Sequence, residues 1–285
     1  MHHPDTPAYR DVSHEEARPL IDAGSVRLLD VRTPEEYEQL GHVPGALLLP
    51  VQMIPCALAT LPTEGAPLLV YCEHGWRSSY ACAFLAKAGY PDVTNLTGGM
   101  SCWTGPRDFS AGDPFASLGP CSWLIENADL LPPSGRALDL ACGPGRHALL
   151  LAAAGFRVHA VDRDSDRIGA LQAAADRMGF PLEADVVDLE VDNADLGTET
   201  YDLIVAVHYL HRPLFPALVR ALRRGGVLLY ETFTLHQAER GKPTNPAFLL
   251  KPGELAELVA PLKVLRQREG EFDGRMVAGV VARQE

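Results

Sequence analysis

Two short segments of the chain combine residue types that could do chemistry. The first begins at Cys72, which ends an apolar run at residues 68–71; Gly75 and Ser78 follow at the spacing of a tight loop that opens a helix. The backbone N–H groups of such a loop converge near a helix start, and Arg77 adds a positive charge. Both effects favour the thiolate. Cys72 is therefore predicted to be a nucleophile or a persulfide carrier, against the alternative of a cysteine that only fills the core.

The second segment is a glycine turn between an apolar strand and a helix. Gly143 and Gly145 let a ligand approach the backbone, and Asp162, which ends the next expected strand, could accept both hydroxyls of a ribose. The dinucleotide pattern G-x-G-x-x-G is not met in this turn. Asp139, just before the turn, would repel a pyrophosphate but could bind the ammonium group of a methionine moiety through water. The residues therefore favour S-adenosyl-L-methionine over a dinucleotide as cofactor.

Length and charge restrict the number of domains and the partners. A chain of 285 residues suits two domains, and 47% hydrophobic residues indicate a globular protein. The net charge is −12 and neither half is basic, so nucleic acid and anionic membranes are not expected as partners. No apolar run is as long as a membrane span, and the cysteines show no disulfide framework spacing. We expect a cytoplasmic protein with reduced thiols, and the oligomeric state stays open.

Strands and helices alternate in two blocks, which predicts an α/β fold in each. The first domain is expected at residues 1–105, a proline-rich linker with the first helix of the next domain at 106–134, and the second domain at 135–285. The first should contain strands at residues 26–31, 47–49, 67–71 and 93–96, and helices after Thr33 and at 78–88. The second should contain strands at 137–141, 157–162, 182–187, 202–207, 227–232, 263–267 and 276–282, and helices at 122–131, 146–154, 164–178, 213–222 and 252–258. Five βα units and a terminal strand pair predict a doubly wound sheet.

Residues 10–105 resemble a single-domain rhodanese. Four motifs in order carry the resemblance, at residues 29–37 (LDVRTPEEY), 41–46 (GHVPGA), 72–78 (C-x-x-G-x-R-S) and 96–103 (L-x-G-G-x-x-x-W). The resemblance implies that Cys72 takes sulfane sulfur from a donor and passes it to a thiophilic acceptor, with Arg77 as the second catalytic residue. The sulfur-binding loop would further comprise Glu73, His74, Gly75, Trp76 and Ser78.

Neighbouring residues qualify the chemistry of this loop. Glu73 places a negative charge beside the cysteine and Trp76 is bulky, so thiosulfate is not expected to be the best donor. Asp30 and Arg32 are expected to form a structural ion pair under the loop. Cys82, on the following helix, is expected in the core, with a resolving thiol as the alternative.

Residues 115–285 resemble a class I S-adenosyl-L-methionine-dependent methyltransferase, closest to small-molecule enzymes of the tellurite-resistance type. The resemblance rests on residues 138–145 (LDLACGPG), on Asp162 and on the terminal strand pair; Ala141 stands where the usual D-x-G-x-G has glycine. It implies a Rossmann-like domain whose cofactor-binding residues are Asp139, Ala141, Gly143 and Gly145 at the methionine end, Asp162 and Arg163 at the ribose, and Asp188 and Leu189 at the adenine. Asp185 is the alternative adenine contact.

The acceptor side is expected on the rim beyond the fourth and fifth strands of the second domain. Its candidate residues are His208, Tyr209, His211, Arg212 and Glu231, and residues 242–249 could close over them as a lid. One histidine could act as a general base; the alternative is capping and loop hydrogen bonding. A metal site is not expected, because no third ligand is obvious beside the two histidines.

The two resemblances together predict a bifunctional enzyme, a rhodanese-like domain followed by a methyltransferase domain. Cys72 would carry a persulfide, and the second domain would methylate a small acceptor, either a thiol or a sulfur species. The alternative keeps the methyltransferase with a metalloid oxyanion or a small metabolite as acceptor, and makes the first domain a module that binds or senses sulfur or oxidants. The expected partners are a small-molecule sulfur donor and a small-molecule methyl acceptor.

Overall fold

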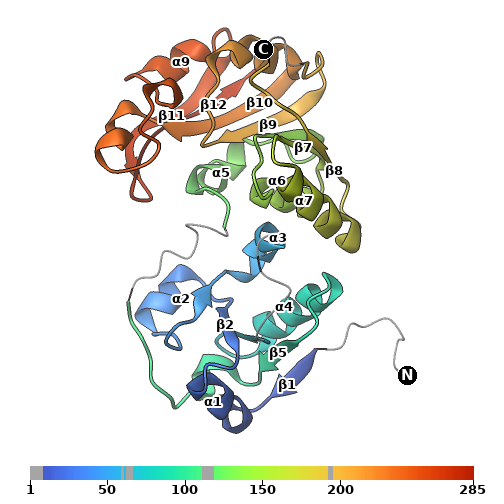
Figure 1. The fold of residues 1–285 in the computed structure, drawn as a ribbon, viewed down its shortest axis with the longest axis vertical. Helices are drawn as coiled ribbons and strands as arrows, with labels where there is room; N and C mark the ends of the chain where they lie inside the picture. The colour runs from blue at the N-terminus through green and yellow to red at the C-terminus, as the bar shows by residue number, and fades with distance from the viewer. Residues whose placement is uncertain (1–8, 59–60, 62–66, 111–118, 192–194) are drawn as a thin grey trace. The chain divides into compact units, whose positions relative to one another are not determined.

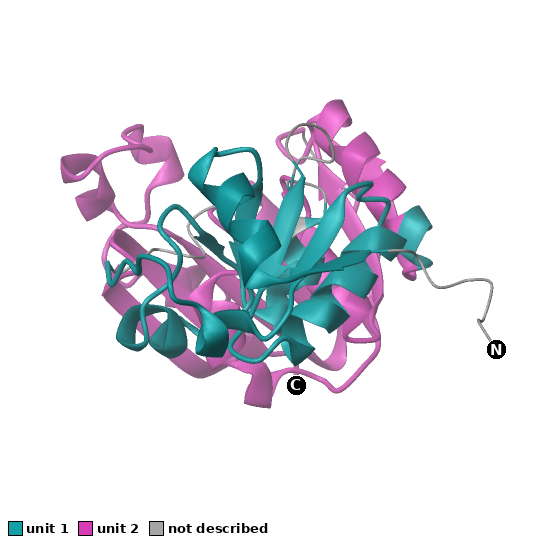
Figure 2. Ribbon diagram, turned by 90° about the horizontal axis from the view of Figure 1, so that it is seen from below, with its two compact units in different colours: residues 1–119, 176–179 teal, residues 120–175, 180–285 magenta. Residues whose placement is uncertain are grey.

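The computed structural model describes residues 9–58, 61, 67–110, 119–191 and 195–285. The chain divides into two compact units, residues 1–119 with 176–179 and residues 120–175 with 180–285, which Figure 2 colours separately. Within the described residues each unit is built on one sheet, and Figure 1 labels most of the elements. Residues 111–118 of the expected linker lie outside the described residues.

The first unit is built on a parallel sheet of five strands in the order β1-β5-β4-β2-β3. Its strands are β1 (Arg10–Val12), β2 (Arg27–Asp30), β3 (Leu47–Leu48), β4 (Leu68–Tyr71) and β5 (Val93–Leu96). Its helices are α1 (His14–Asp22), α2 (Pro34–Gln39), α3 (Ile54–Ala57) and α4 (Trp76–Lys87), with 3₁₀ turns η1 (Val51–Met53) and η2 (Gly99–Cys102). β1, α1 and α3 add to the elements that the sequence predicts.

Local sequence explains how these elements carry the cysteine loop. Thr33 caps α2 in a capping box with Glu36, and Pro34 occupies the first turn. β4 lies between β5 and β2 and is buried along its whole length, which accounts for its uninterrupted apolar and aromatic residues. The strand therefore delivers Cys72 to the carboxyl edge of the sheet, where open α/β folds place their ligands.

The second unit is built on a sheet of seven strands in the order β11-β12-β10-β9-β6-β7-β8. Its strands are β6 (Arg136–Leu140), β7 (Arg157–Asp162), β8 (Leu182–Val186), β9 (Tyr201–Val207), β10 (Leu222–Phe233), β11 (Lys263–Phe272) and β12 (Arg275–Arg283). Its helices are α5 (Ser122–Glu126), α6 (Arg146–Ala153), α7 (Ser165–Met178), α8 (Phe215–Ala221) and α9 (Glu254–Leu258). Its 3₁₀ turns are η3 (Ala128–Leu130), η4 (Arg212–Leu214), η5 (Leu235–Glu239) and η6 (Pro246–Phe248). β12 runs antiparallel to β10 and β11, and the other strand pairs are parallel.

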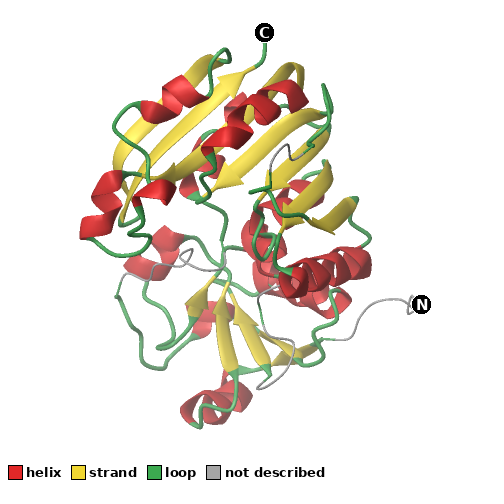
Figure 3. Cartoon of the chain, turned by 45° about the horizontal axis from the view of Figure 1, so that its top comes forward, coloured by secondary structure: helices red, strands yellow, loops and turns green. Residues whose placement is uncertain are grey.

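Strand alternation separates the two faces of this sheet. Leu138 of β6 shares a core with Leu218 of α8 and Leu255 of α9. Asp139, the next residue, points to the opposite face, where its carboxylate accepts a hydrogen bond from the Ala148 N–H of α6. Helices therefore cover both faces of the sheet. Figure 3 shows the helices in red and the strands in yellow. The expected doubly wound arrangement is confirmed.

Gly99 tests how tightly the first unit holds the cysteine loop. Its φ is +56°, and a Cβ built on it would overlap the Cys72 carbonyl oxygen. Gly99→Ala should therefore destabilise the first unit by more than the roughly 1–2 kcal/mol that a left-handed alanine costs. Gly24→Ala is the matched control, because Gly24 has φ +62° with nothing within 4 Å of its Cβ position. Urea unfolding measures both losses, and equal losses would contradict the importance of this contact.

Candidate functional site

The Cys72 thiol lies at the carboxyl end of β4 and is only 1% exposed. The Gly75 N–H donates a hydrogen bond to its Sγ over 3.1 Å, and the Ser78 hydroxyl donates over 3.4 Å. Burial opposes ionisation of this thiol, but the hydrogen bonds from Ser78 and from the backbone of His74 and Gly75 outweigh it and lower the pKa of Cys72. The predicted ring of donors around Cys72 is present.

A second segment of the chain holds this loop from behind. The Met100 N–H donates to the Cys72 carbonyl over 2.8 Å, and the Ser101 N–H donates to the Glu73 carbonyl over 2.9 Å. Gly75 has φ +93°, and a Cβ there would lie 3.3 Å from a backbone nitrogen of the same second segment. The loop backbone is thereby fixed, and its donors are oriented before any ligand binds.

Arg77, at the end of the loop, is paired with Glu36 of α2. Its two terminal nitrogens donate to the two carboxylate oxygens over 2.7 and 2.6 Å, a bidentate contact. The Arg77 hydrogen bond lowers the pKa of Glu36 to about 2, so Glu36 is ionised at neutral pH. The pKa of Arg77 is raised first by its hydrogen bond to Glu36 and also by the charge of Cys72. The guanidinium therefore lies within electrostatic reach of the sulfur.

Glu73 is paired with a buried arginine under the loop. Its carboxylate accepts a hydrogen bond from Arg32 over 2.9 Å. Arg32 also donates to both oxygens of Asp30, over 2.8 to 3.1 Å, and to the Gly41 carbonyl over 2.8 Å. The expected ion pair between Asp30 and Arg32 is confirmed. Glu73 is consequently not the isolated negative charge that its position in the sequence suggests.

The remaining residues around the loop differ in exposure. His74 is exposed, and Trp76 is 85% exposed at the first turn of α4, so most of its ring is out of contact with the protein. Cys82 is fully buried, and burial raises its pKa far above that of an ordinary thiol. This environment suits a core residue better than a resolving thiol.

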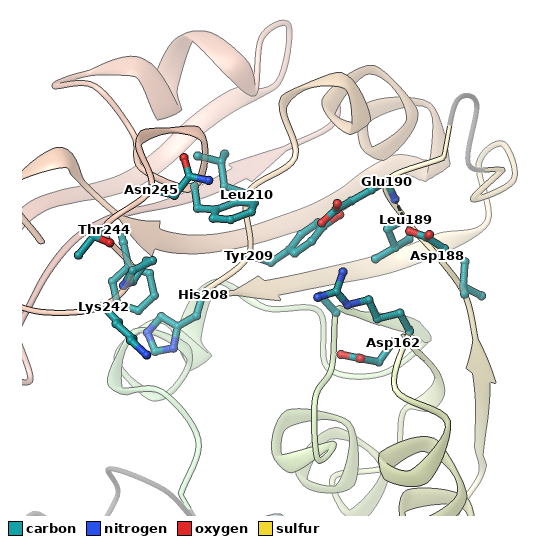
Figure 4. Close-up of a pocket in the computed structure, with 16 residues that line it drawn as sticks. Asp162, Asp188, Leu189, Glu190, His208, Tyr209, Leu210, Lys242, Thr244 and Asn245 are labelled. Carbon is teal, nitrogen blue, oxygen red and sulfur yellow. Dashed lines mark hydrogen bonds between the residues drawn. The ribbon is translucent and has the colours of Figure 1, made fainter. Parts of the chain in front are cut away.

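The second unit contains a cavity of about 620 Å³ that faces the carboxyl ends of β7, β9 and β10, a volume suited to a ligand of cofactor size. Figure 4 shows its lining. The predicted residues among the lining are Ala141, Asp162, Arg163, Asp188, Leu189, His208 and Tyr209. The other lining residues are Val187, Glu190, Leu210, Phe233 and Phe248, with Lys242, Pro243, Thr244 and Asn245 from the expected lid.

The glycine turn holds Asp162 at the cavity. Its Oδ2 accepts a hydrogen bond from the Gly143 N–H over 2.8 Å, and its Oδ1 accepts one from the N–H two residues further on over 3.0 Å. Ala141 has φ +52°, a left-handed conformation that glycine adopts more easily, which explains why glycine is usual at this position. Gly143 and Gly145 lie outside the lining and shape the turn; a Cβ on Gly145 would overlap a leucine of α7.

Asp139 supports the start of α6 and lies outside the cavity lining. It is 1% exposed, and its carboxylate accepts the Ala148 N–H over 2.9 Å. Burial raises the pKa of Asp139 to about 7. The Asp139 carboxylate is therefore used within the fold, and its expected contact with the methionine end of a cofactor stays a prediction.

His208 and Tyr209 bring polar atoms to the cavity. His208 has φ +59° and stacks on Phe233 with ring centroids 4.6 Å apart. Burial, together with the charges of Arg275 and Arg146, lowers the pKa of His208 to about 3, so its ring is neutral at neutral pH. The Tyr209 hydroxyl is buried and has no hydrogen-bond partner among the described residues. An unpartnered buried hydroxyl in a cavity wall indicates a position for a polar ligand atom.

Arg212, predicted at the acceptor, instead holds the expected lid. It makes a bidentate contact to Glu254 over 2.7 and 2.9 Å. It also donates to the carbonyls of Ala247 and Leu249, each over 2.9 Å. Its guanidinium is thus used within the scaffold, and Arg212 is absent from the cavity lining.

Glu231, His211 and Asp185 also lie outside the lining. Glu231 is 3% exposed and accepts two hydrogen bonds from Arg268, over 3.0 and 2.6 Å. Arg268 is stacked against two aromatic rings, with its Cζ 4.6 and 4.1 Å from their centroids. Asp185 pairs with His159 over 3.0 Å. The charge of Glu231 is therefore already paired in the interior, and its contact with the acceptor stays a prediction.

Glu36 and Glu190 are site residues that the sequence does not indicate. Glu36 has the spacing of a capping-box residue, which it is, and nothing along the chain connects it with Arg77. Glu190 follows the expected adenine contacts by one position, and that proximity is its only signal. Among the described residues no group of three histidines, cysteines or acids could hold a metal ion.

Comparisons with known proteins assign the two units to different domain families. Residues 13–105 match the rhodanese-like domain, and residues 137–226 match a methyltransferase domain. A sulfurtransferase of Allochromatium vinosum is 43% identical over 84 residues, which cover 30% of this chain and 77% of that protein. The thiosulfate sulfurtransferase GlpE of Pseudomonas fluorescens is 33% identical over 108 residues, which cover 37% of this chain and 96% of that protein.

Among solved structures, TehB from Haemophilus influenzae is similar in fold. The TM-score is 0.51 at 22% identity, and the match covers 60% of this chain and 65% of the TehB chain. Among the described residues, no helix is long and apolar enough to cross a membrane.

The match covers most of the length of both relatives but only 30% and 37% of this chain. The residues that match the methyltransferase domain come after those that match the rhodanese-like domain. The chain therefore belongs to the rhodanese-like sulfurtransferase family, and it is an enzyme in which a rhodanese-like domain precedes a methyltransferase domain.

Proposed function

We propose that Cys72 carries sulfane sulfur as a persulfide and that the second unit methylates a small acceptor, a thiol or sulfur species derived from it, with S-adenosyl-L-methionine as methyl donor. The observation that carries the proposal is the pairing on one chain of a hydrogen-bonded thiol of lowered pKa with a cavity that is lined by Asp162 and a neutral His208. Joining the two sites on one chain raises the concentration of the product of one at the other.

Sulfur transfer needs a thiolate and a place for the charge of the persulfide. The Cys72 thiolate attacks the outer sulfur of the donor, the donor's S–S bond breaks, and the remainder leaves with the electron pair. The terminal sulfur of the persulfide then carries the negative charge, and the N–H groups of the loop are oriented to donate to it. Transfer of that sulfur to a thiophilic acceptor returns Cys72 to the thiolate.

The cavity residues fit the proposed cofactor. Asp162 is oriented by the Gly143 N–H and retains acceptor capacity for ribose hydroxyls. Asp188 and Leu189 line the same cavity and suit an adenine. The Tyr209 hydroxyl, which has no hydrogen-bond partner among the described residues, can bond to a polar atom of the ligand. When bound, S-adenosyl-L-methionine supplies a methyl group made electrophilic by its sulfonium centre.

The acceptor end of the cavity combines a neutral base with apolar walls. The His208 ring is neutral and can orient a thiol by accepting its S–H hydrogen bond on a ring nitrogen, but with a pKa lowered to about 3 it is too weak a base to hold the thiol proton alone. Phe233 and Phe248 form apolar parts of the cavity wall, and Lys242 adds a positive charge to the lining. The apolar part of this wall suits a soft thiol, which loses less hydration on entering it than an oxyanion does.

Ser78→Ala tests the thiolate at Cys72. The variant loses a donor to Sγ, so the pKa of Cys72 should rise, and alkylation by iodoacetamide should reach its midpoint at higher pH than in the wild type. The wild-type midpoint should itself lie below that of an ordinary thiol. Ser79→Ala is the control, because the Ser79 hydroxyl bonds to Tyr9 over 2.6 Å. Mass spectrometry of the Cys72 peptide gives the profiles, and identical profiles for all three proteins would contradict the role of Ser78.

Asp162→Asn tests the cofactor site. An amide replaces one of the two acceptor oxygens by a donor, so S-adenosyl-L-methionine should bind about tenfold more weakly or worse. Isothermal titration calorimetry measures the affinity. Asp166→Asn, in the first turn of α7, removes the same charge outside the cavity lining and should bind as the wild type does. Unchanged affinity in Asp162→Asn would rule out the ribose contact.

A further inference from the structure

The charges beside Cys72 do not favour an anionic donor. Arg77 is bidentate on Glu36, and Arg32 is shared between Asp30 and Glu73. Three carboxylates therefore face two guanidinium groups, and the cluster is negative before the Cys72 thiolate is counted. A loop built to attract a dianion is expected to show the opposite balance.

Glu36 is the carboxylate of this cluster that can be replaced to change its net charge. Asp30 and Arg32 are fully buried, and removing either would leave an unpaired charge in the interior. Glu36 and Arg77 lie at the surface, with side chains 24% and 34% exposed. Both terminal nitrogens of Arg77 donate hydrogen bonds to Glu36. The negative charge of Glu36 therefore offsets the positive charge of Arg77, which attracts an anionic sulfur donor less.

We propose that Glu36 is a specificity-determining residue of the sulfurtransferase site: by holding Arg77 it disfavours dianionic donors such as thiosulfate and favours organic persulfides with an uncharged substituent. The inference rests on the proposed sulfur transfer at Cys72. The bond changes are the same for both donors, since Cys72 forms one S–S bond and the donor loses one. Thiosulfate leaves as sulfite, and an organic persulfide leaves as its thiolate.

Glutamine at position 36 can test this charge without removing the helix cap. Glu36 also accepts the Thr33 N–H over 3.0 Å as part of the capping box of α2. The amide oxygen of glutamine keeps that acceptor, because glutamine serves in capping boxes as glutamate does. Glu36→Gln therefore removes the negative charge and leaves the local backbone its partner.

The experiment follows persulfide formation on Cys72 of the full chain by mass spectrometry, with thiosulfate or the persulfide of 2-mercaptoethanol as donor. Glu36→Gln should raise the loading rate with thiosulfate about tenfold relative to the rate with the organic persulfide, because one negative charge near the dianion is lost. Glu35→Gln is the matched control: Glu35 is exposed and precedes Glu36 in the first turn of α2, whereas Arg77 is paired with Glu36. Its ratio of rates should equal that of the wild type.

The outcomes separate the specificity from the sulfur carrier itself. Adding Arg77→Gln to Glu36→Gln should abolish the gain with thiosulfate, because the released guanidinium causes it. Equal changes with both donors, or the same gain in Glu35→Gln, would overturn the role of Glu36 while Cys72 still carries sulfur. If neither thiosulfate nor the organic persulfide loads the wild type, the carrier function is contradicted and the role of Glu36 falls with it.

Discussion

Backbone N–H groups at the carboxyl end of a parallel strand are the interaction on which both sites depend. In the first unit the Gly75 N–H donates to the Cys72 sulfur, and in the second the Gly143 N–H donates to Asp162. One residue in the left-handed backbone conformation shapes each turn: Gly75 with φ +93° in the first unit and Ala141 with φ +52° in the second. Because packed sheets fix the strand ends, the donors are oriented before a ligand arrives and need no rearrangement to act.

Ion pairs in both units neutralise charged side chains within the fold, and so they decide which charges a ligand meets. Arg32 and Arg268 are almost entirely buried, and each is paired with a buried carboxylate, Asp30 and Glu231 respectively. Removing one partner of such a pair typically costs about 3–5 kcal/mol, so these residues maintain the scaffold. The groups that remain available for reaction are those without a charged partner in the interior, notably the Cys72 thiol and the polar atoms of the cavity.

Features that depend on neighbours along the chain could be predicted from the sequence. The apolar run before Cys72 and the glycine turn after β6 mark both sites, because turn chemistry is local. α1 escapes prediction because Pro19, a residue that usually ends helices, lies inside it, and β1 because only the last of its three residues is buried. Contacts between distant segments have no such signal: Glu36 meets Arg77 41 residues further on, and Glu231 meets its arginine 37 residues further on. Polar residues at strand ends were therefore predictable, but not whether each faces the cavity or a buried partner.

Both sites meet in one proposed reaction, in which sulfur carried by Cys72 becomes the methyl acceptor of the second unit. The most direct measurement incubates the full chain with a sulfane donor and S-adenosyl-L-methionine labelled in its methyl group, and follows label in methylated sulfur products. Labelled product is expected with the wild type and should be lost with Cys72→Ser, although that variant still binds the cofactor. Equal labelling by both proteins would contradict it.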